Sequence, residues 1–342
     1  MKSHLLTFGD HLPDPVTGTS TTVAERHAAI IESAVAAEAA GFDGFNVGEH
    51  HAGPFVSVSP PVLLAAVAAR TSTLRLGTGV TLLANSDPLR VAEDFAVLDL
   101  VSGGRAEMCV GRGNLFAKTY EIFGQSLDDS RQLFEENVEL LLRLWTEESV
   151  TWSGLSRPPL RDVTLQPRPI QVPHPPLAIG GGGSAETAHL AARLGLPLVL
   201  PSGFSAPDRF VPVVETYKEA FRSVEGSQPR IGACWHVNVA PTSQQARERW
   251  RPRFTAYHDW FGSLVQSQTP GFTSAPLDFE WTITHGSAVA GSPAEVTERL
   301  LYLSETLDID TNLIYVDSGG APLPEVLDMI DLLGHEVLPK LA

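Results

Sequence analysis

Residues Leu74–Gly113 read LRLGTGVTLLANSDPLRVAEDFAVLDLVSGGRAEMCVGRG and contain one strand–helix unit followed by the next strand. The apolar runs Leu74–Gly79 and Arg105–Val110 have the length of buried strands. Between them, apolar residues recur at helical spacing over Pro88–Val101. A strand, a helix and a second strand in this order predict a parallel sheet covered by helices.

The same alternation runs through the rest of the chain and predicts eight strand–helix units. The expected strands are His4–Phe8, Phe42–Val47, Leu74–Gly79, Arg105–Val110, Pro176–Ile179, Pro197–Leu200, Arg230–Val239 and Thr311–Val316. The expected helices are Ala24–Ala40, Pro61–Arg70, Pro88–Val101, Ser130–Trp145, Ser184–Arg193, Asp208–Val224, Ser243–Trp260 and Pro324–Leu338. Eight such units favour an α/β fold of the (β/α)8 TIM-barrel type, in a single domain spanning residues 1–342.

The length of the chain requires insertions in this barrel. A (β/α)8 barrel needs about 250 residues, and this chain has 342. The segment 150–175 is rich in Pro, Arg and Trp, and the segment 261–290 is rich in Gly, Ser, Thr and Pro. The second segment is too long for an ordinary connection and has the composition of either a mobile lid or surface decoration.

Composition excludes several classes of partner. The chain has 24 Lys and Arg against 40 Asp and Glu, a formal net charge of −16, which argues against nucleic acid and anionic membranes as general partners. No stretch is long and apolar enough to span a membrane, and the start MKSHLLTFGD does not resemble a secretory signal. The two cysteines, Cys109 and Cys234, are too few for a disulfide framework. We therefore expect a cytoplasmic protein.

Active residues of a (β/α)8 barrel lie at the carboxyl ends of its strands. The second strand ends in Glu49-His50-His51. Because side chains alternate along a strand, Glu49 and His51 should share one side and His50 should face the other. This divergence argues against a metal site. His50 is a candidate for handling a proton, and the alternative is a structural, hydrogen-bonded histidine.

Glycines surround the ends of the third and fourth strands. Thr78 and Gly79 end the third strand, where glycine permits close approach of a ligand or, alternatively, a bulge. Arg112 stands between two glycines after the fourth strand and is followed two residues later by Asn114. An arginine in this position can bind a phosphate through two hydrogen bonds, and the alternative is a surface ion pair.

Four glycines, Gly180–Gly183, lead from the fifth strand into a helix that begins at Ser184. The free N–H groups and the dipole of a helix N-terminus favour a phosphate. The pattern is neither a dinucleotide fingerprint, nor a P-loop, nor a nucleophile elbow. We expect a phosphate site that this segment shares with Arg112. The residues of the segment that belong to it are Gly182, Gly183, Ser184 and Thr187. The alternative is a plain glycine-rich helix cap.

These residues resemble the luciferase-like flavin monooxygenase family over nearly the whole chain. The resemblance rests on AEAAGFDGFNVGEHH (Ala37–His51), the stretch Leu74–Gly113, PPLAIGGGGSAETAHLAARLGLPLVL (Pro175–Leu200) and AVAGSPAEVTERL (Ala288–Leu300). It implies a barrel that binds reduced FMN supplied by a separate flavin reductase. In the family, O2 adds to this flavin to give a C4a-hydroperoxide, which oxidises a small-molecule substrate.

The resemblance also assigns roles to individual positions. It implies that His50 is catalytic, with Glu49 beside it in the same motif. It places FMN contacts on the residues already singled out, namely Thr78, Gly79, Arg112, Asn114, Gly182, Gly183, Ser184 and Thr187. It further implies a non-proline cis peptide at Gly79–Val80 and a homodimer that packs through the second and third helices.

The chain departs from the luciferase pattern at two positions. Gly111 stands where the luciferase has a reactive cysteine, and Gly183 stands where it has a glutamate, which puts light emission and an aldehyde substrate in doubt. A related branch uses the deazaflavin F420 for hydride transfer, and another relative is a non-catalytic flavin-binding protein, so both remain alternatives. We expect the substrate pocket to be lined by Phe8, Phe55, Trp235, His236 and the segment Trp260–Trp281.

Overall fold

The computed structural model describes residues 1–181, 183–222, 228–269, 271–272 and 278–341. Its central sheet is a nearly closed barrel of parallel strands, which confirms the expected α/β barrel. The strands of this sheet are β1 (Lys2–Thr7), β2 (Gly44–Val47), β3 (Arg75–Thr78), β4 (Thr81–Leu82), β5 (Met108–Gly111), β8 (Leu177–Gly180), β9 (Leu198–Leu200), β10 (Ile231–Val239), β11 (Ala288–Gly291) and β12 (Thr311–Tyr315).

The strands follow one another around the barrel in the order of the chain. The pairs run from β1 to β2 and β3, then from β5 through β8, β9 and β10 to β12, which returns to β1. β3 and β4 are two halves of one barrel position, separated by the cis peptide Gly79–Val80 that the family resemblance implied. A bridge between Leu76 and Ala106 joins β3 to the chain entering β5, and Thr81 of β4 pairs with Val110.

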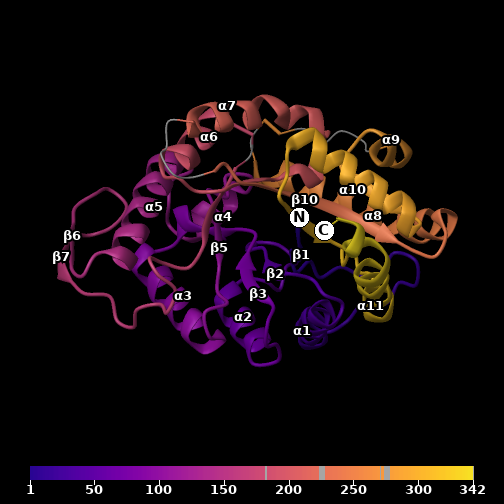
Figure 1. Ribbon diagram of the computed structural model, residues 1–342, viewed down its shortest axis with the longest axis horizontal. Helices are drawn as coiled ribbons and strands as arrows, with labels where there is room; N and C mark the ends of the chain where they lie inside the picture. The colour runs from indigo at the N-terminus through magenta and orange to yellow at the C-terminus, as the bar shows by residue number, and fades with distance from the viewer. Residues whose placement is uncertain (182, 223–227, 270, 273–277, 342) are drawn as a thin grey trace.

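Helices surround this barrel (Figure 1). The longer ones are α1 (Val23–Ala39), α2 (Pro60–Ala68), α3 (Pro88–Ser102), α5 (Ser130–Thr146), α6 (Ala185–Arg193), α7 (Val211–Phe221), α8 (Ser243–Gln268), α10 (Pro293–Leu307) and α11 (Leu323–Leu332). Shorter turns are α4 (Ala117–Ile122), α9 (Phe279–Thr284), α12 (Leu338–Leu341), η1 (Leu83–Asn85), η2 (Ser202–Phe204), η3 (Pro207–Phe210) and η4 (Leu333–Val337). No helix within the described ranges combines the length and apolar character needed to cross a membrane.

Local sequence explains where these helices begin and end. Thr22 and Glu25 form a reciprocal capping box at the start of α1, which satisfies two free backbone N–H groups. Asp87 accepts a hydrogen bond from the N–H of Leu89 at the start of α3. Gly103 ends α3 in the left-handed conformation that glycine adopts without steric cost. The apolar faces of the helices then pack on the outside of the barrel and form the main core.

The two segments expected as insertions contain regular structure that the sequence did not predict. The helix expected to end at Trp260 continues to Gln268 because Phe261 and Val265 are buried beneath it. α9 and β11 follow within and just after the 261–290 segment, and β11 pairs with the far half of β10. In the 150–175 segment, β6 (Val150–Trp152) and β7 (Leu160–Val163) form an antiparallel pair that projects from the barrel at the left of Figure 1.

Candidate functional site

A cavity of about 910 Å³ opens at the carboxyl ends of the barrel strands. Its wall includes residues from the ends of β1, β2, β5, β8 and β10 and from the first turn of α6. This volume lies near the upper end of the usual range for small-molecule sites. An apolar cluster surrounds one half of it, and the members that line the wall are Leu6, Phe8, Phe116, Cys234, Phe261, Val265 and Leu313.

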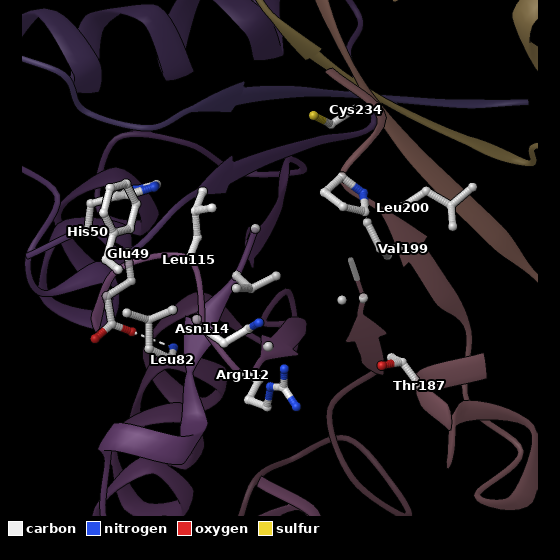
Figure 2. A pocket seen from close by; sticks show the side chains of 18 of the residues that line it. Glu49, His50, Leu82, Arg112, Asn114, Leu115, Thr187, Val199, Leu200 and Cys234 are labelled. Atoms are coloured by element: carbon white, nitrogen blue, oxygen red, sulfur yellow. Dashed lines mark hydrogen bonds between the residues drawn. The ribbon is translucent and has the colours of Figure 1, made fainter. Parts of the chain in front are cut away.

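The other half of the cavity carries an arginine that faces a helix N-terminus. Arg112 follows β5, and Thr187 lies in the first turn of α6; their side chains flank the same space in Figure 2. Within the described ranges, the guanidinium of Arg112 makes no hydrogen bond or ion pair. Ser184 caps α6, and its hydroxyl lies 3.2 Å from that of Thr187. The arrangement offers a cation, two hydroxyls and free backbone N–H groups to one anion.

Glycines bring the backbone close to this anion site. A Cβ at Gly181 would lie 2.4 Å from Cγ2 of Thr187, and a Cβ at Gly180 would lie 2.5 Å from Cγ1 of Val80. A Cβ at Gly111 would lie 2.6 Å from Cγ2 of Val80. Gly111 is the position where the luciferase has a reactive cysteine. In this chain Val80 occupies the space that such a side chain would need.

His50 lies in the wall between aromatic rings. Its ring stacks on Phe55 at a centroid distance of 4.4 Å and meets the edges of Phe8 and Phe116 at 5.4 and 5.7 Å. Burial among these rings, together with the neighbouring His51, lowers the pKa of His50 to about 3. Nδ1 of His50 is buried and has no hydrogen-bond partner in the described part of the chain. The imidazole is therefore neutral at physiological pH.

Glu49 is held by its neighbours. His51 donates a hydrogen bond of 2.8 Å from Nε2 to Glu49 Oε1, and the N–H of Leu82 donates one of 2.9 Å to Oε2 (Figure 2). The N–H of Glu49 itself donates to the carbonyl of Val80. The expected division of the motif is confirmed, since Glu49 and His51 interact while His50 turns the other way. Oε1 of Glu49 thus binds the loop after β2, and Oε2 binds the chain just after the cis peptide.

The cavity brings together most of the residues that the sequence singled out. Glu49, His50, Gly79, Arg112, Asn114, Ser184 and Thr187 all line it. Thr78 lies outside this lining, buried in the barrel wall, and its hydroxyl donates to the carbonyl of Cys109 at 2.9 Å. Gly183 adopts φ +87° and lies beside the described lining, and Gly182 falls outside the described residues.

The expected substrate wall is partly wrong. Phe8 and the segment after Trp260 line the cavity, but Phe55, Trp235 and His236 lie outside the described lining. Side chains alternate along β10, so Cys234 faces the cavity while Trp235 points outward and donates to Asn312 Oδ1 at 2.7 Å. Burial raises the pKa of Cys234 to about 11, which keeps this thiol neutral.

The sequence placed the segment after Trp260 in the cavity wall, but it did not predict that this segment continues α8 or that His258 joins it. The residues of α8 that line the cavity are His258, Asp259, Phe261, Gly262 and Val265, and Thr269 lines it just past the end of the helix. Their spacing of three, four and seven residues describes one face of a helix, and this signal was visible in the sequence. Polar and glycine residues interrupt this face of the helix, so its apolar pattern is weak in the sequence. Among the described residues, no group of three or more His, Cys, Asp or Glu side chains is placed to bind a metal ion.

Comparison with known proteins relates this chain to a family. The family model described as luciferase-like monooxygenase matches residues 1–308. Limonene 1,2-monooxygenase of Rhodococcus erythropolis is 28% identical over 87% of this chain and 77% of its own length. The monooxygenase RslO1 of Streptomyces bottropensis is 27% identical, with a TM-score of 0.87 and complete coverage of both chains.

Two more distant structures share the fold and differ in cofactor. The oxygenating constituent of 3,6-diketocamphane monooxygenase from Pseudomonas putida, solved with FMN, has a TM-score of 0.80 at 20% identity and covers 99% of this chain and 98% of its own. An F420-dependent secondary alcohol dehydrogenase has a TM-score of 0.76 at 22% identity, with complete coverage of both chains. Both comparisons show that this chain shares its fold with these two enzymes.

Proposed function

Because the chain belongs to the luciferase-like monooxygenase family, we propose that it uses reduced FMN and O2 to oxidise a small organic substrate. A separate flavin reductase would supply the reduced FMN. The enzyme would act in the cytoplasm, without nucleic acid or a membrane as partner. When bound, reduced FMN supplies the electrons that activate O2.

The observation that carries this proposal is that Arg112 faces the N-terminus of α6 and that its guanidinium has no partner among the residues the structure describes. A phosphate monoester placed there would accept hydrogen bonds from the Arg112 guanidinium, from the hydroxyls of Ser184 and Thr187 and from backbone N–H groups. Gly180 and Gly181 let the backbone of this segment pack directly against Val80 and Thr187, since a Cβ on either would collide with these side chains. These residues fit the phosphate of FMN.

The remaining wall supports oxidation chemistry on an apolar substrate. The neutral imidazole of His50 can exchange one hydrogen bond with a reacting oxygen without introducing a charge. The rings of Phe8, Phe116 and Phe261 surround this end of the cavity and exclude water from it. Glu49 would act indirectly, by holding Leu82 and His51 in place.

The decisive experiment is a titration of the purified protein with FMN and with F420, followed by oxygen consumption in the presence of a flavin reductase. We expect binding of FMN, and oxygen-dependent product formation that is lost in His50→Phe. Tight binding of F420 without binding of FMN would instead support hydride transfer by the deazaflavin. FMN binding with no turnover for any substrate tested would support a non-catalytic flavoprotein.

We also propose that the protein is a homodimer of single barrel domains, each spanning residues 1–342. α2 and α3 pack side by side, and they leave four apolar side chains exposed, namely Val62, Val97, Leu100 and Val101. A second copy packing on this surface would remove it from water.

A further inference from the structure

One face of α8 forms a wall of the apolar half of the cavity. The residues on it are His258, Phe261, Gly262 and Val265, and together with Thr269 just past the helix end they form what we call the α8 stripe. The end of the helix is tied across the cavity: Gln268 donates to the carbonyl of Ala52 at 3.1 Å, and Thr269 donates to that of Leu115. These carbonyls belong to the loops that follow β2 and β5, which also carry His50 and Arg112.

A buried ion pair just before the stripe also supports α8. Arg253 donates from Nε and Nη2 to the two carboxylate oxygens of Asp14, each at 3.0 Å. It also donates from Nη1 to Glu325 at 2.7 Å. Arg253 is 5% exposed and Asp14 is 2% exposed, so water does not compete for these bonds. A two-point contact between planar groups restricts both the position and the rotation of the helix.

The backbone of α8 is also closely packed at this residue. A Cβ at Gly319 would lie 2.6 Å from the carbonyl oxygen of Arg253, so the loop after β12 reaches the helix only because Gly319 lacks a side chain. The N–H of Gly319 donates to Asp10 at 2.9 Å. Asp10 and Asp14 lie in the same loop after β1. The loop after β1 therefore contacts α8 through the carboxylate of Asp14. It contacts the loop after β12 through the carboxylate of Asp10.

The same loop supports the residue that shields His50. Asp10 forms a β-bridge with Phe55, and the N–H of His11 donates to the carbonyl of Pro54 at 2.8 Å. Phe55 stacks on the ring of His50. The loop after β1 thus supports two parts of the apolar half of the cavity. It contacts α8 through Asp14, and it contacts the Phe55–His50 stack through Asp10.

We propose that Arg253 is a positioning residue whose contacts with Asp14 set the α8 stripe against His50 and so close the apolar half of the cavity to water. This inference rests on the proposed function, in which FMN occupies the half marked by Arg112. Loss of the Arg253–Asp14 pair lets the α8 stripe move away from the apolar half of the cavity. The anion site on β5 and α6 contributes no side chain to the pair and is unaffected.

The test uses a double replacement, because removal of one partner would leave a buried charge uncompensated. Arg253→Met with Asp14→Leu replaces the pair by apolar groups, and Glu325, which is partly exposed, keeps its contact with Arg249 at 3.6 Å. Arg251→Met is the matched control, since Arg251 lies on the same helix, is half exposed and pairs with Glu280. Arg253→Lys keeps the charge without the two-point contact and should give an intermediate effect. Circular dichroism verifies that each variant is folded.

Two probes report on the two halves of the cavity. For bound oxidised FMN, we expect iodide quenching of its fluorescence to rise at least about twofold in the double variant, because the chamber admits water. Its affinity for FMN should change by no more than about twofold, as expected for distant, independent sites. The neutral apolar fluorophore N-phenyl-1-naphthylamine should bind at least about fivefold more weakly, because the apolar half of the cavity loses the wall that the α8 stripe forms. Arg251→Met should match the wild type in all three measurements.

The outcomes separate this inference from the proposed function. Unchanged quenching and unchanged fluorophore affinity in a folded double variant would overturn the role of Arg253. If the wild type binds no FMN, the proposed function fails, and the fluorophore alone decides whether Arg253 positions the stripe. If the wild type binds neither FMN nor the fluorophore, the apolar half of the cavity does not bind apolar ligands and the inference is wrong.

Discussion

Glu49 accepts a hydrogen bond of 2.8 Å from His51, while the ring of His50, which lies between them in the sequence, stacks on Phe55 at a centroid distance of 4.4 Å. The other oxygen of Glu49 accepts from the N–H of Leu82 at 2.9 Å. One carboxylate therefore joins the end of β2 to the chain that follows the cis peptide. His50 is presented to the cavity by this arrangement.

Replacement of Glu49 tests this positioning role. Glu49→Ala should lower the free energy of unfolding by about 1–3 kcal/mol, because the N–H of Leu82 and the ring of His51 lose their acceptor. Glu49→Gln can still accept from Leu82 and should cost less. Urea denaturation at neutral pH measures both. An alanine variant as stable as the wild type would show that these bonds do not support the site.

Replacement of Arg112 tests the anion site. Arg112→Ala should weaken FMN binding about 10- to 100-fold, the loss of one hydrogen-bonded charge contact. Binding of riboflavin, which lacks the phosphate, should change little. Fluorescence titration of both ligands gives the comparison, and Arg70→Ala, an exposed arginine paired with Glu32, is the control. Equal losses for FMN and riboflavin would contradict a phosphate contact.

His50 should affect stability below neutral pH. Its pKa is lowered to about 3 in the folded protein from 6.5, so the unfolded chain binds the extra proton first as the pH falls. Stability should therefore decrease as the pH falls from 6.5 towards 3, and His50→Phe should weaken this dependence. Urea midpoints between pH 5 and 7.5 for the two proteins measure the difference. Identical slopes would mean that His50 is not desolvated.

Turnover provides a separate test of His50. His50→Phe should reduce the rate of substrate oxidation by about 10²- to 10⁴-fold, the usual contribution of a residue that exchanges a proton or hydrogen bond with the reacting group. FMN affinity should be retained, because Arg112 and α6 hold the phosphate. A variant with normal turnover would remove His50 from the mechanism.

His4 should act in the opposite pH range. Burial disfavours its charged form, but hydrogen bonding and charge attraction from Glu107 outweigh burial and raise the pKa of His4 above 6.5. Its contribution to stability is complete below pH 6.5 and is lost as the pH rises through the raised pKa. His4→Gln should therefore show a smaller loss of stability between pH 6 and 9 than the wild type. A larger loss in the variant would contradict this account.

The apolar surface of α2 and α3 gives a prediction for assembly. Light scattering should show a dimer for the wild type and the 36.8 kDa monomer for Leu100→Glu, since a buried unpaired charge opposes association. Val172→Glu changes a side chain that is 91% exposed elsewhere on the surface and should remain dimeric. A wild-type monomer would show that this surface has another role.

Most of the barrel could be predicted because its signals are local. The alternation of strands and helices, the glycine-rich strand ends and the cap at Ser184 each depend on a few consecutive residues. Parallel strands place their carboxyl ends at the same edge, so Arg112 and Thr187 could be expected to share one site although they lie on different elements. The alternation of strands and helices predicted neither the length of α8 nor the strand β11. Burial of Phe261 and Val265 in the folded protein stabilises the end of α8, and β11 forms by pairing with β10.

The sequence by itself therefore determined the fold and the opposite orientations of His50 and His51, and it predicts an anion site at Arg112 and the N-terminus of α6. Tertiary structure decided which side chains surround His50, since Phe8, Phe55 and Phe116 come from three separate segments and together lower its pKa. It also decided the pair of Asp14 and Arg253, which are 239 residues apart. Contacts at such separation depend on how the whole chain packs, and no local pattern of residues encodes them.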